Sequence, residues 1–201
     1  MLVKDAKKIT DSLTRTSKMP GLSYSLPAWA CQTGAKLRKI PTSPCFGCYA
    51  FKNNYIRYPA IKAAQYRRLD AINHPQWTRA MAVQIKNQKY FRWHDAGDIQ
   101  SVEHLRKIFE VCRLTPDTHH WLPTQERQYI LAVNPDEVPD NLIIRLSGSR
   151  VDGPAPKAWP HTSSVVTDGT ASCPAPSQGG KCLDCRACWN KSVANVSYGK
   201  H

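Results

Sequence analysis

Residues 90–98 run Tyr90-Phe91-Arg92-Trp93-His94-Asp95-Ala96-Gly97-Asp98 and form the clearest strand-and-turn unit of the chain. Four residues of strand-like composition open into a polar turn, and residues 101–113 then carry the apolar stripe of a helix. Cys112 lies on that stripe, so we expect it to be a buried apolar residue rather than a metal ligand. A strand, a polar turn and a helix in this order are typical of a parallel α/β sheet.

The same alternation extends over most of the chain. Further strands are expected at 22–27, 120–124, 141–147 and 163–167, and helices at 59–72, 77–85 and 129–133, the first with Pro59 at its N1 position. A complete eight-fold barrel normally needs roughly 200 or more residues. Two long cysteine-containing loops take up part of this chain, so the sequence predicts an abbreviated, partly open (β/α) barrel.

Polar residues follow each expected strand, and ligands gather at the carboxyl ends of parallel strands. We therefore expect one functional rim that unites the candidate catalytic and binding residues with both cysteine loops. The candidates are His94, Asp95 and Asp98 for catalysis, and Gly97, Gln125, Arg145 and Ser147 for cofactor binding.

The C-terminal loop, residues 173–188, holds Cys173, Cys182, Cys185 and Cys188, three of them as C-x2-C-x2-C. A run of three cysteines plus a remote Cys-Pro is one way in which proteins hold a [4Fe–4S] cluster. Zinc is the competing metal, since four-thiolate zinc sites also use C-x2-C. Disulfides are the third reading, disfavoured because the first residues lack a secretory signal. Trp189 is expected to shield the metal from water.

The loop 31–48 carries Cys31, Cys45 and Cys48 between glycines and prolines. A loop this long is usually functional or held in place, and three thiols suggest a metal as the holder. The seven cysteines do not divide into two sets of four. One cluster therefore has an open iron or a non-cysteine ligand, or the chain holds a single cluster.

The 201 residues carry a net charge of +13 and fit a single domain over 21–201 preceded by a basic arm, residues 1–20. Residues 1–68 contribute +11 of that charge, from thirteen Lys or Arg against two Asp. Such an excess attracts polyanions such as nucleic acid, keeps the surface solvated, or offsets the charge of a cluster. No apolar run approaches the ~20 residues of a membrane span, so we expect no membrane partner and a cytoplasmic location.

The combination of Cys31, Cys45-Phe46-Gly47-Cys48-Tyr49-Ala50, Arg92–Asp98 and Cys182–Trp189 resembles the phage and prophage "gene product 88" type of protein over most of the chain. It is also similar, more distantly, to the radical S-adenosylmethionine superfamily. The resemblance implies a phage-encoded iron–sulfur protein on a radical-SAM-like partial barrel, located in the host cytoplasm.

In the radical S-adenosylmethionine superfamily, three cysteines after the first strand hold a four-iron cluster with one iron open for the cosubstrate. Cys31, Cys45 and Cys48 occupy the corresponding loop, although the usual C-x3-C-x2-C spacing becomes C-x13-C-x2-C. Gly97-Asp98 takes the place of the turn that holds the methionyl amino group. From the sequence alone, Asp98 is as well suited to cap the helix that follows it.

Two functions remain open at this stage. The first is an iron–sulfur redox or radical-SAM-like enzyme with one or two [4Fe–4S] clusters, S-adenosylmethionine and an electron donor protein as partner. The second is a structural zinc or iron–sulfur protein that binds nucleic acid through its basic N-terminal third. Aromatic residues lie among the basic ones there and favour base stacking; they are Trp29, Tyr49, Phe51, Tyr55 and Tyr58.

Overall fold

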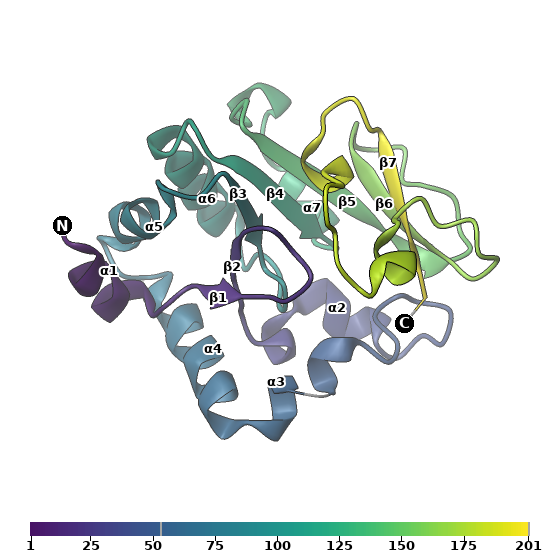
Figure 1. Cartoon of the computed structure of the whole chain (residues 1–201), viewed down its shortest axis with the longest axis horizontal. Helices are drawn as coiled ribbons and strands as arrows, with labels where there is room; N and C mark the ends of the chain where they lie inside the picture. The colour runs from purple at the N-terminus through teal and green to yellow at the C-terminus, as the bar shows by residue number, and fades with distance from the viewer. Residues whose placement is uncertain (53, 201) are drawn as a thin grey trace.

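The computed structural model describes residues 1–52 and 54–200, which form a mixed α/β fold around one seven-stranded sheet (Figure 1). The strands follow the chain order: β1 (Thr14–Arg15), β2 (Leu22–Tyr24), β3 (Tyr90–Trp93), β4 (His119–Thr124), β5 (Leu142–Val151), β6 (Thr162–Val166) and β7 (Asn195–Gly199). β1 pairs antiparallel with β2, and all other pairs are parallel.

The sheet is open, because β1 and β7 lie at its two edges and no pairing within the described residues joins them. The expected parallel α/β architecture is thus confirmed, whereas a barrel is not. The edge strands β1 and β7 match no expected strand.

The helices are α1 (Val3–Thr10), α2 (Gln32–Leu37), α3 (Asn54–Arg57), α4 (Pro59–Ala71), α5 (Trp77–Ile85), α6 (Val102–Leu114) and α7 (Arg127–Ile130). Pro59 is the first residue of α4, as expected. Ser101 caps α6, its hydroxyl accepting a hydrogen bond from the His104 amide at 3.0 Å, so Asp98 is not the N-cap. No helix in the described part of the chain has the length and apolar character to span a bilayer.

The two faces of the sheet have different partners, because successive side chains of a strand alternate in direction. Phe91, Trp93, Leu122 and Ile144 pack with residues of α5 and α6 in the main core. On the other face, Tyr90, Trp121 and Val196 pack against Cys188 and Trp189 of the C-terminal loop. Cys112 is fully buried in the main core, which confirms its apolar role.

The segment 1–20, expected as a basic arm, contains a packed helix. Ala6 and Thr10 of α1 are fully buried, and the Gln84 amide of α5 donates to the Thr10 hydroxyl at 2.6 Å. The Tyr24 hydroxyl of β2 donates to the Thr10 carbonyl at 3.0 Å. Helix α1 therefore belongs structurally to the domain.

Strand β5 also differs from expectation. It does not end at Gly148 but continues to Val151, with an irregularity in its pairing to β6. Arg145 and Ser147 therefore lie within the strand and not at its carboxyl end, while the pairing of Thr124 with Leu146 places Ser147 level with the residue that follows β4.

Candidate metal centres

The first cysteine group, Cys31, Cys45 and Cys48, follows β2 and comes together around the start of α2. Cys31 is the residue before α2, and Cys45 and Cys48 lie in a turn in which the Cys48 amide donates to the Cys45 carbonyl at 3.2 Å. A Cβ atom added at Gly34 would lie 3.7 Å from the Sγ of Cys31 and 3.9 Å from that of Cys45. The absence of a side chain at Gly34 therefore leaves space beside two of the thiols.

These thiols are protonated in the metal-free protein at neutral pH. Burial is the largest cause that raises the pKa of Cys31 and that raises the pKa of Cys45 to about 12, and the Asp98 carboxylate and the neighbouring cysteines contribute to both shifts. Burial likewise raises the pKa of Cys48, while the nearby cations Arg38 and Lys52 lower it. A metal bound by this group would have to displace these protons.

Asp98 lies beside this group, since its charge raises the pKa of both Cys31 and Cys45. Its carboxylate accepts hydrogen bonds from the Thr124 hydroxyl at 2.6 Å and from the amides of Ile99 and Gln125, each at 2.8 Å. It therefore joins the turn after β3 to the carboxyl end of β4. Burial raises the pKa of Asp98 to about 7, although these hydrogen bonds oppose the shift.

Gly97 and Asp95 hold the turn after β3 against its neighbours. Gly97 has φ +80°, and a Cβ there would lie 2.6 Å from the Cβ of Leu26, so glycine is required on both counts. Asp95 accepts hydrogen bonds from the hydroxyls of Ser23, at 2.6 Å, and Tyr55, at 2.8 Å. The Tyr49 hydroxyl donates to the Asp95 backbone carbonyl. Asp95 thus ties the segment after Cys48 to the sheet.

The second group consists of Cys173, Cys182, Cys185 and Cys188, which line one small pocket together with apolar residues, among them Trp189 and Val196. Backbone hydrogen bonds position three of the four cysteines: the Cys182 amide donates to the Lys18 carbonyl, the Cys173 amide to the Ser197 carbonyl and the Cys185 amide to the Cys182 carbonyl. Cys188 Sγ lies 3.1 Å from the Tyr198 hydroxyl, and burial raises its pKa to about 11.

Neither group has the tight geometry of a single-ion site. Among the described residues, no three His, Cys, Asp or Glu side chains converge closely enough to hold one metal ion. The four iron atoms of a cubane occupy its corners, so its thiolates stand farther apart than those around one zinc ion. The donor set of the second group, four cysteines lining an otherwise apolar pocket, fits a cluster chemically.

Comparison with known proteins gives one match. The family model described as gene product 88 matches residues 1–191, a range that includes both cysteine groups. The chain belongs to the gene product 88 family. No curated protein and no solved structure matches the chain. Family membership thus confirms the resemblance to gene product 88, while the match carries no information on radical S-adenosylmethionine chemistry.

In this gene product 88 protein, His94 is buried between β2 and α6. It has φ +57°, and its Nδ1 is 3.1 Å from the Tyr24 carbonyl. The centre of its ring lies 6.1 Å from that of Trp93 and 5.4 Å from that of His104 on α6. Burial lowers the pKa of His94 to about 4, so the ring is neutral at pH 7. The His94 ring thus meets Tyr24 and α6, whereas the Asp95 carboxylate meets Ser23 and Tyr55.

Arg145 has a structural position that the sequence did not predict. Its guanidinium group is fully buried and donates to the backbone carbonyl oxygens of six residues at 2.9–3.3 Å. They are Thr162, Ala187, Cys188, Asn190, Val193 and Ala194. Arg145 therefore holds the segment that carries Cys188, and no donor of it is directed at a ligand.

Gln125 and Ser147 link neighbouring strands. The Gln125 side-chain amide donates to the Gly148 carbonyl at 3.1 Å, and the Ser163 hydroxyl donates to that of Ser147 at the same distance. Gln125 remains close to the first cysteine group through its backbone bond to Asp98. Ser147 connects β5 to β6.

Arg92 was missed as a site residue, although it stands in the quoted motif. Its guanidinium carbon lies 4.6 Å from the centre of the Trp121 ring, and no carboxylate in the described part of the chain is within ion-pairing distance. Burial lowers its pKa, but nearby acidic groups outweigh this effect and raise it: Tyr49 and Asp95 near the first group, and Tyr198 and Cys188 near the second. Arg92 is thus a cation between the two groups.

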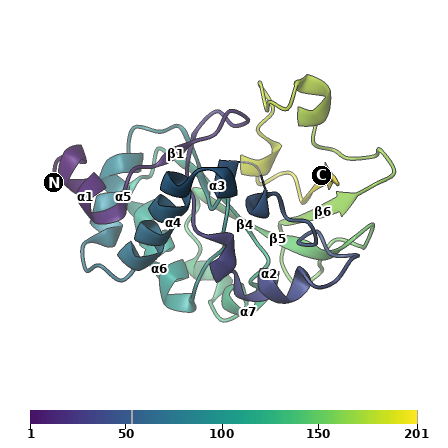
Figure 2. The same cartoon turned by 90° about the horizontal axis from the view of Figure 1, so that it is seen from below.

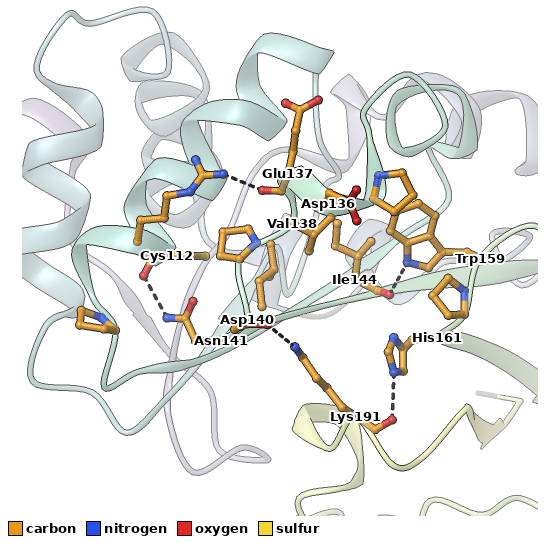
Figure 3. A pocket seen from close by; sticks show the side chains of 16 residues that line it. Cys112, Asp136, Glu137, Val138, Asp140, Asn141, Ile144, Trp159, His161 and Lys191 are labelled. Carbon is orange, nitrogen blue, oxygen red and sulfur yellow. Dashed lines mark hydrogen bonds and ion pairs between the residues drawn. The ribbon is translucent and has the colours of Figure 1, made fainter.

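A larger surface cavity, about 720 Å³, lies elsewhere in the fold (Figure 3). It opens where β5 and β6 begin, between residues that include Glu137, Asp140, Trp159, His161 and Lys191. None of the predicted ligands or catalytic residues lines it. Because the cysteine groups are located elsewhere, we do not regard this cavity as the centre of the chemistry.

Proposed function

We propose that this protein binds two [4Fe–4S] clusters and uses one of them in radical-SAM-like chemistry on a substrate that it holds at the first cysteine group. The observation that carries the proposal is the separation of seven cysteines into a group of three and a group of four. Four thiolates complete the coordination of a cluster, and three leave one iron open. The group of four would then hold a fully coordinated cluster, and the group of three would hold the cluster that binds the cosubstrate.

Charge supports an anionic group at the second site. A [4Fe–4S] cluster with four thiolates carries about −2 in its usual oxidised state. Arg92 and Arg145 both lower the pKa of Cys188, and neither has a carboxylate partner among the described residues. Buried charges are usually paired. An anionic cluster would add a negative charge near both guanidinium groups.

The first group suits a cosubstrate, because it has three cysteines and a neighbouring carboxylate. Gly97 and Asp98 lie in the turn after β3, and the Asp98 carboxylate is near Cys31 and Cys45. A carboxylate offers about four acceptor positions, and Asp98 uses three on Thr124, Ile99 and Gln125. The fourth is suited to the amino group of S-adenosylmethionine. Cys31, Cys45 and Cys48 would hold a cluster whose open iron would supply, with an electron from a donor protein, one-electron reductive cleavage of a carbon–sulfur bond of the S-adenosylmethionine sulfonium.

Anaerobic addition of S-adenosylmethionine to the reduced protein tests this function. We expect a change in the electron paramagnetic resonance spectrum of the reduced cluster, followed by formation of methionine and 5′-deoxyadenosine. The Cys48→Ala variant should lose both effects, whereas the paramagnetic signal of the second group should persist in it. An iron-loaded wild-type protein that shows neither a spectral change nor products would contradict the radical-SAM-like activity.

Zinc at the second group is the alternative that its four thiolates favour, because C-x2-C steps are also typical of zinc sites. A Zn(Cys)4 site carries the same −2 charge, so the two arginines do not discriminate between the metals. Metal and sulfide analysis does. One zinc per chain without sulfide would replace the cluster at this site by a structural zinc.

A further inference from the structure

The segment between Asp11 and Asp70 forms the most one-sided surface of the chain. Residues 12–69 contain ten Lys or Arg and no Asp or Glu. Seven of these cations are exposed and form no ion pair within the described residues: Arg15 on β1, and a set of six, Lys36, Arg38, Lys39, Lys52, Arg57 and Lys62. The six belong to α2, α3, α4 and the loops between them, which lie together in front in Figure 2. A polyanion is therefore the partner that this surface attracts.

Exposed aromatic rings lie among these cations. Phe46 and Tyr58 are each 48% exposed, and Tyr66 is 39% exposed. Of the five aromatic residues that the sequence suggested, Tyr58 is exposed, whereas Trp29, Phe51 and Tyr55 are only partly exposed and the Tyr49 hydroxyl donates to the Asp95 carbonyl. Trp29 and Phe51 instead pack edge-to-face, with ring centroids 4.9 Å apart.

Helix α4 arranges two of the exposed rings around a lysine. Tyr58 directly precedes the helix, and Lys62 and Tyr66 follow at successive steps of four residues. Residues four apart are neighbours on a helix surface, and each step advances about 6 Å along the axis. The result is a helix face with an exposed ring, a lysine and an exposed ring in succession; the Lys62 ammonium lies 4.8 Å from the centre of the Trp29 ring. Exposed rings spaced in this way suit bases that stack one by one, while the cation meets the intervening phosphate.

We propose that the face formed by the Phe46 loop, α3 and α4 binds single-stranded nucleic acid. Bases of a duplex are stacked on each other and hide their faces, so only an unpaired strand can use the three rings. An acidic protein would satisfy the charge but would leave the rings exposed to water. The combination of rings and cations therefore favours a single strand over both alternatives.

The nucleic-acid-binding face adjoins the first cysteine group. Phe46 lies between Cys45 and Cys48 in the chain, so a strand stacked on Phe46 passes beside the three thiols. Binding of the strand does not require a metal. That the bound strand is also the substrate of the first group rests on the proposed function.

Fluorescence anisotropy with labelled oligonucleotides tests the binding. We expect at least ten-fold tighter binding of single-stranded DNA or RNA than of the matching duplex. The logarithm of the binding constant should fall with the logarithm of salt concentration with a slope between about −2 and −4, as for three to six phosphate contacts. Equal affinity for duplex, or equal competition by polyglutamate, would overturn the single-strand assignment in favour of a general polyanion surface.

Variants separate stacking from charge. Tyr58→Ala and Tyr66→Ala should each weaken binding on the order of five-fold or more, without changing the salt slope. Lys62→Gln should reduce the slope by roughly one contact. Leu131→Ala, at a residue 48% exposed on α7's C-terminal side, and Lys86→Gln, at an exposed lysine after α5, are matched controls that should bind like wild type. If the tyrosine variants also bind like wild type, the proposal is wrong.

The metal dependence distinguishes the two proposals from each other. Cys48→Ala, which should lack the first cluster, is expected to bind the oligonucleotide within about two-fold of wild type. Retained binding by a protein that never cleaves S-adenosylmethionine would leave the strand-binding face intact and contradict only the proposed enzyme. Loss of oligonucleotide binding in the iron-loaded wild type would contradict the strand-binding face and leave the proposed enzyme intact.

Discussion

The Arg145 guanidinium donates from Nε to the backbone carbonyl oxygen of Cys188 at 3.1 Å, across 43 residues of sequence. The same side chain donates to five more carbonyl oxygens, four of them between Ala187 and Ala194. A single cation on β5 thus fixes the backbone of the segment that ends the second cysteine group. The shape of this group depends on a residue of the central sheet.

Replacement of Arg145 should unfold the C-terminal loop. Hydrogen bonds from a charged donor contribute about 1.5–3 kcal/mol each, so we expect Arg145→Lys to lower the free energy of unfolding by about 3 kcal/mol or more. Urea denaturation measures this. Arg113→Lys is the control, because Arg113 is exposed and donates to a single carbonyl, that of Glu137. A loss below about 1 kcal/mol in Arg145→Lys would show that the six bonds are not structural.

Arg92 should tune the electron affinity of a cluster in the second group. A cation near a cluster stabilises its reduced, more negative state, so Arg92→Gln should lower the reduction potential. Loss of about 1 kcal/mol of charge interaction corresponds to roughly 40 mV for a one-electron couple. A redox titration followed by visible absorption measures the shift. The exposed Arg113→Gln should leave the potential unchanged, and an unshifted Arg92→Gln would place Arg92 away from the cluster.

His94 should affect stability and not metal content. The variant His94→Asn keeps a residue type that tolerates the left-handed backbone at φ +57° but removes the buried ring. We expect the free energy of unfolding to fall by about 2–4 kcal/mol, as for other losses of core volume. Iron per folded chain should equal that of wild type. A variant of normal stability that has lost its iron would instead indicate a direct role of His94 at the cluster.

Asp98 should titrate near neutral pH in the metal-free protein. Its pKa is raised to about 7 by burial, whereas an aspartate in an unfolded chain titrates near pH 3.9. Between these values the folded protein holds a proton that the unfolded chain releases. The contribution of Asp98 to stability is therefore complete below about pH 4 and is lost as the pH rises to about 7.

Carbon-13 NMR of the Asp98 carboxyl group measures this pKa. Thr124→Val removes a donor that stabilises the carboxylate, so the pKa should rise further in this variant. A wild-type pKa near 4, unaffected by Thr124→Val, would mean that Asp98 is more solvated than the structure places it.

The parallel α/β arrangement could be predicted because each central strand carries its own local signal. The aromatic and basic run at β3, the apolar stripe of α6 and the proline at the start of α4 are all confirmed. The edge strands β1 and β7 could not be predicted. A strand of two residues such as β1 has too few side chains for a periodic pattern, and it exists only because β2 pairs with it.

The two groups of cysteines could be recognised in the sequence, but the residues that position them could not. The motif of β3 identified Gly97 and Asp98, which do lie with the first cysteine group. Arg145 and Ser147 were misplaced because Gly148 was taken as the end of a strand that continues to Val151. The positions of Arg92 and His94 depend on which face of the sheet each side chain meets. The direction of the His94 side chain depends on the backbone turn at this residue, which a linear pattern does not reveal.

The most direct test of two separate clusters is iron and acid-labile sulfide analysis of anaerobically purified wild type, Cys48→Ala and Cys185→Ala. We predict about eight iron and eight sulfide per wild-type chain, about four of each in either variant, and absorbance near about 400 nm in all three. Colourless protein with one zinc and no sulfide would contradict the account. So would four iron in wild type that only one of the two variants loses, since the chain would then hold a single cluster.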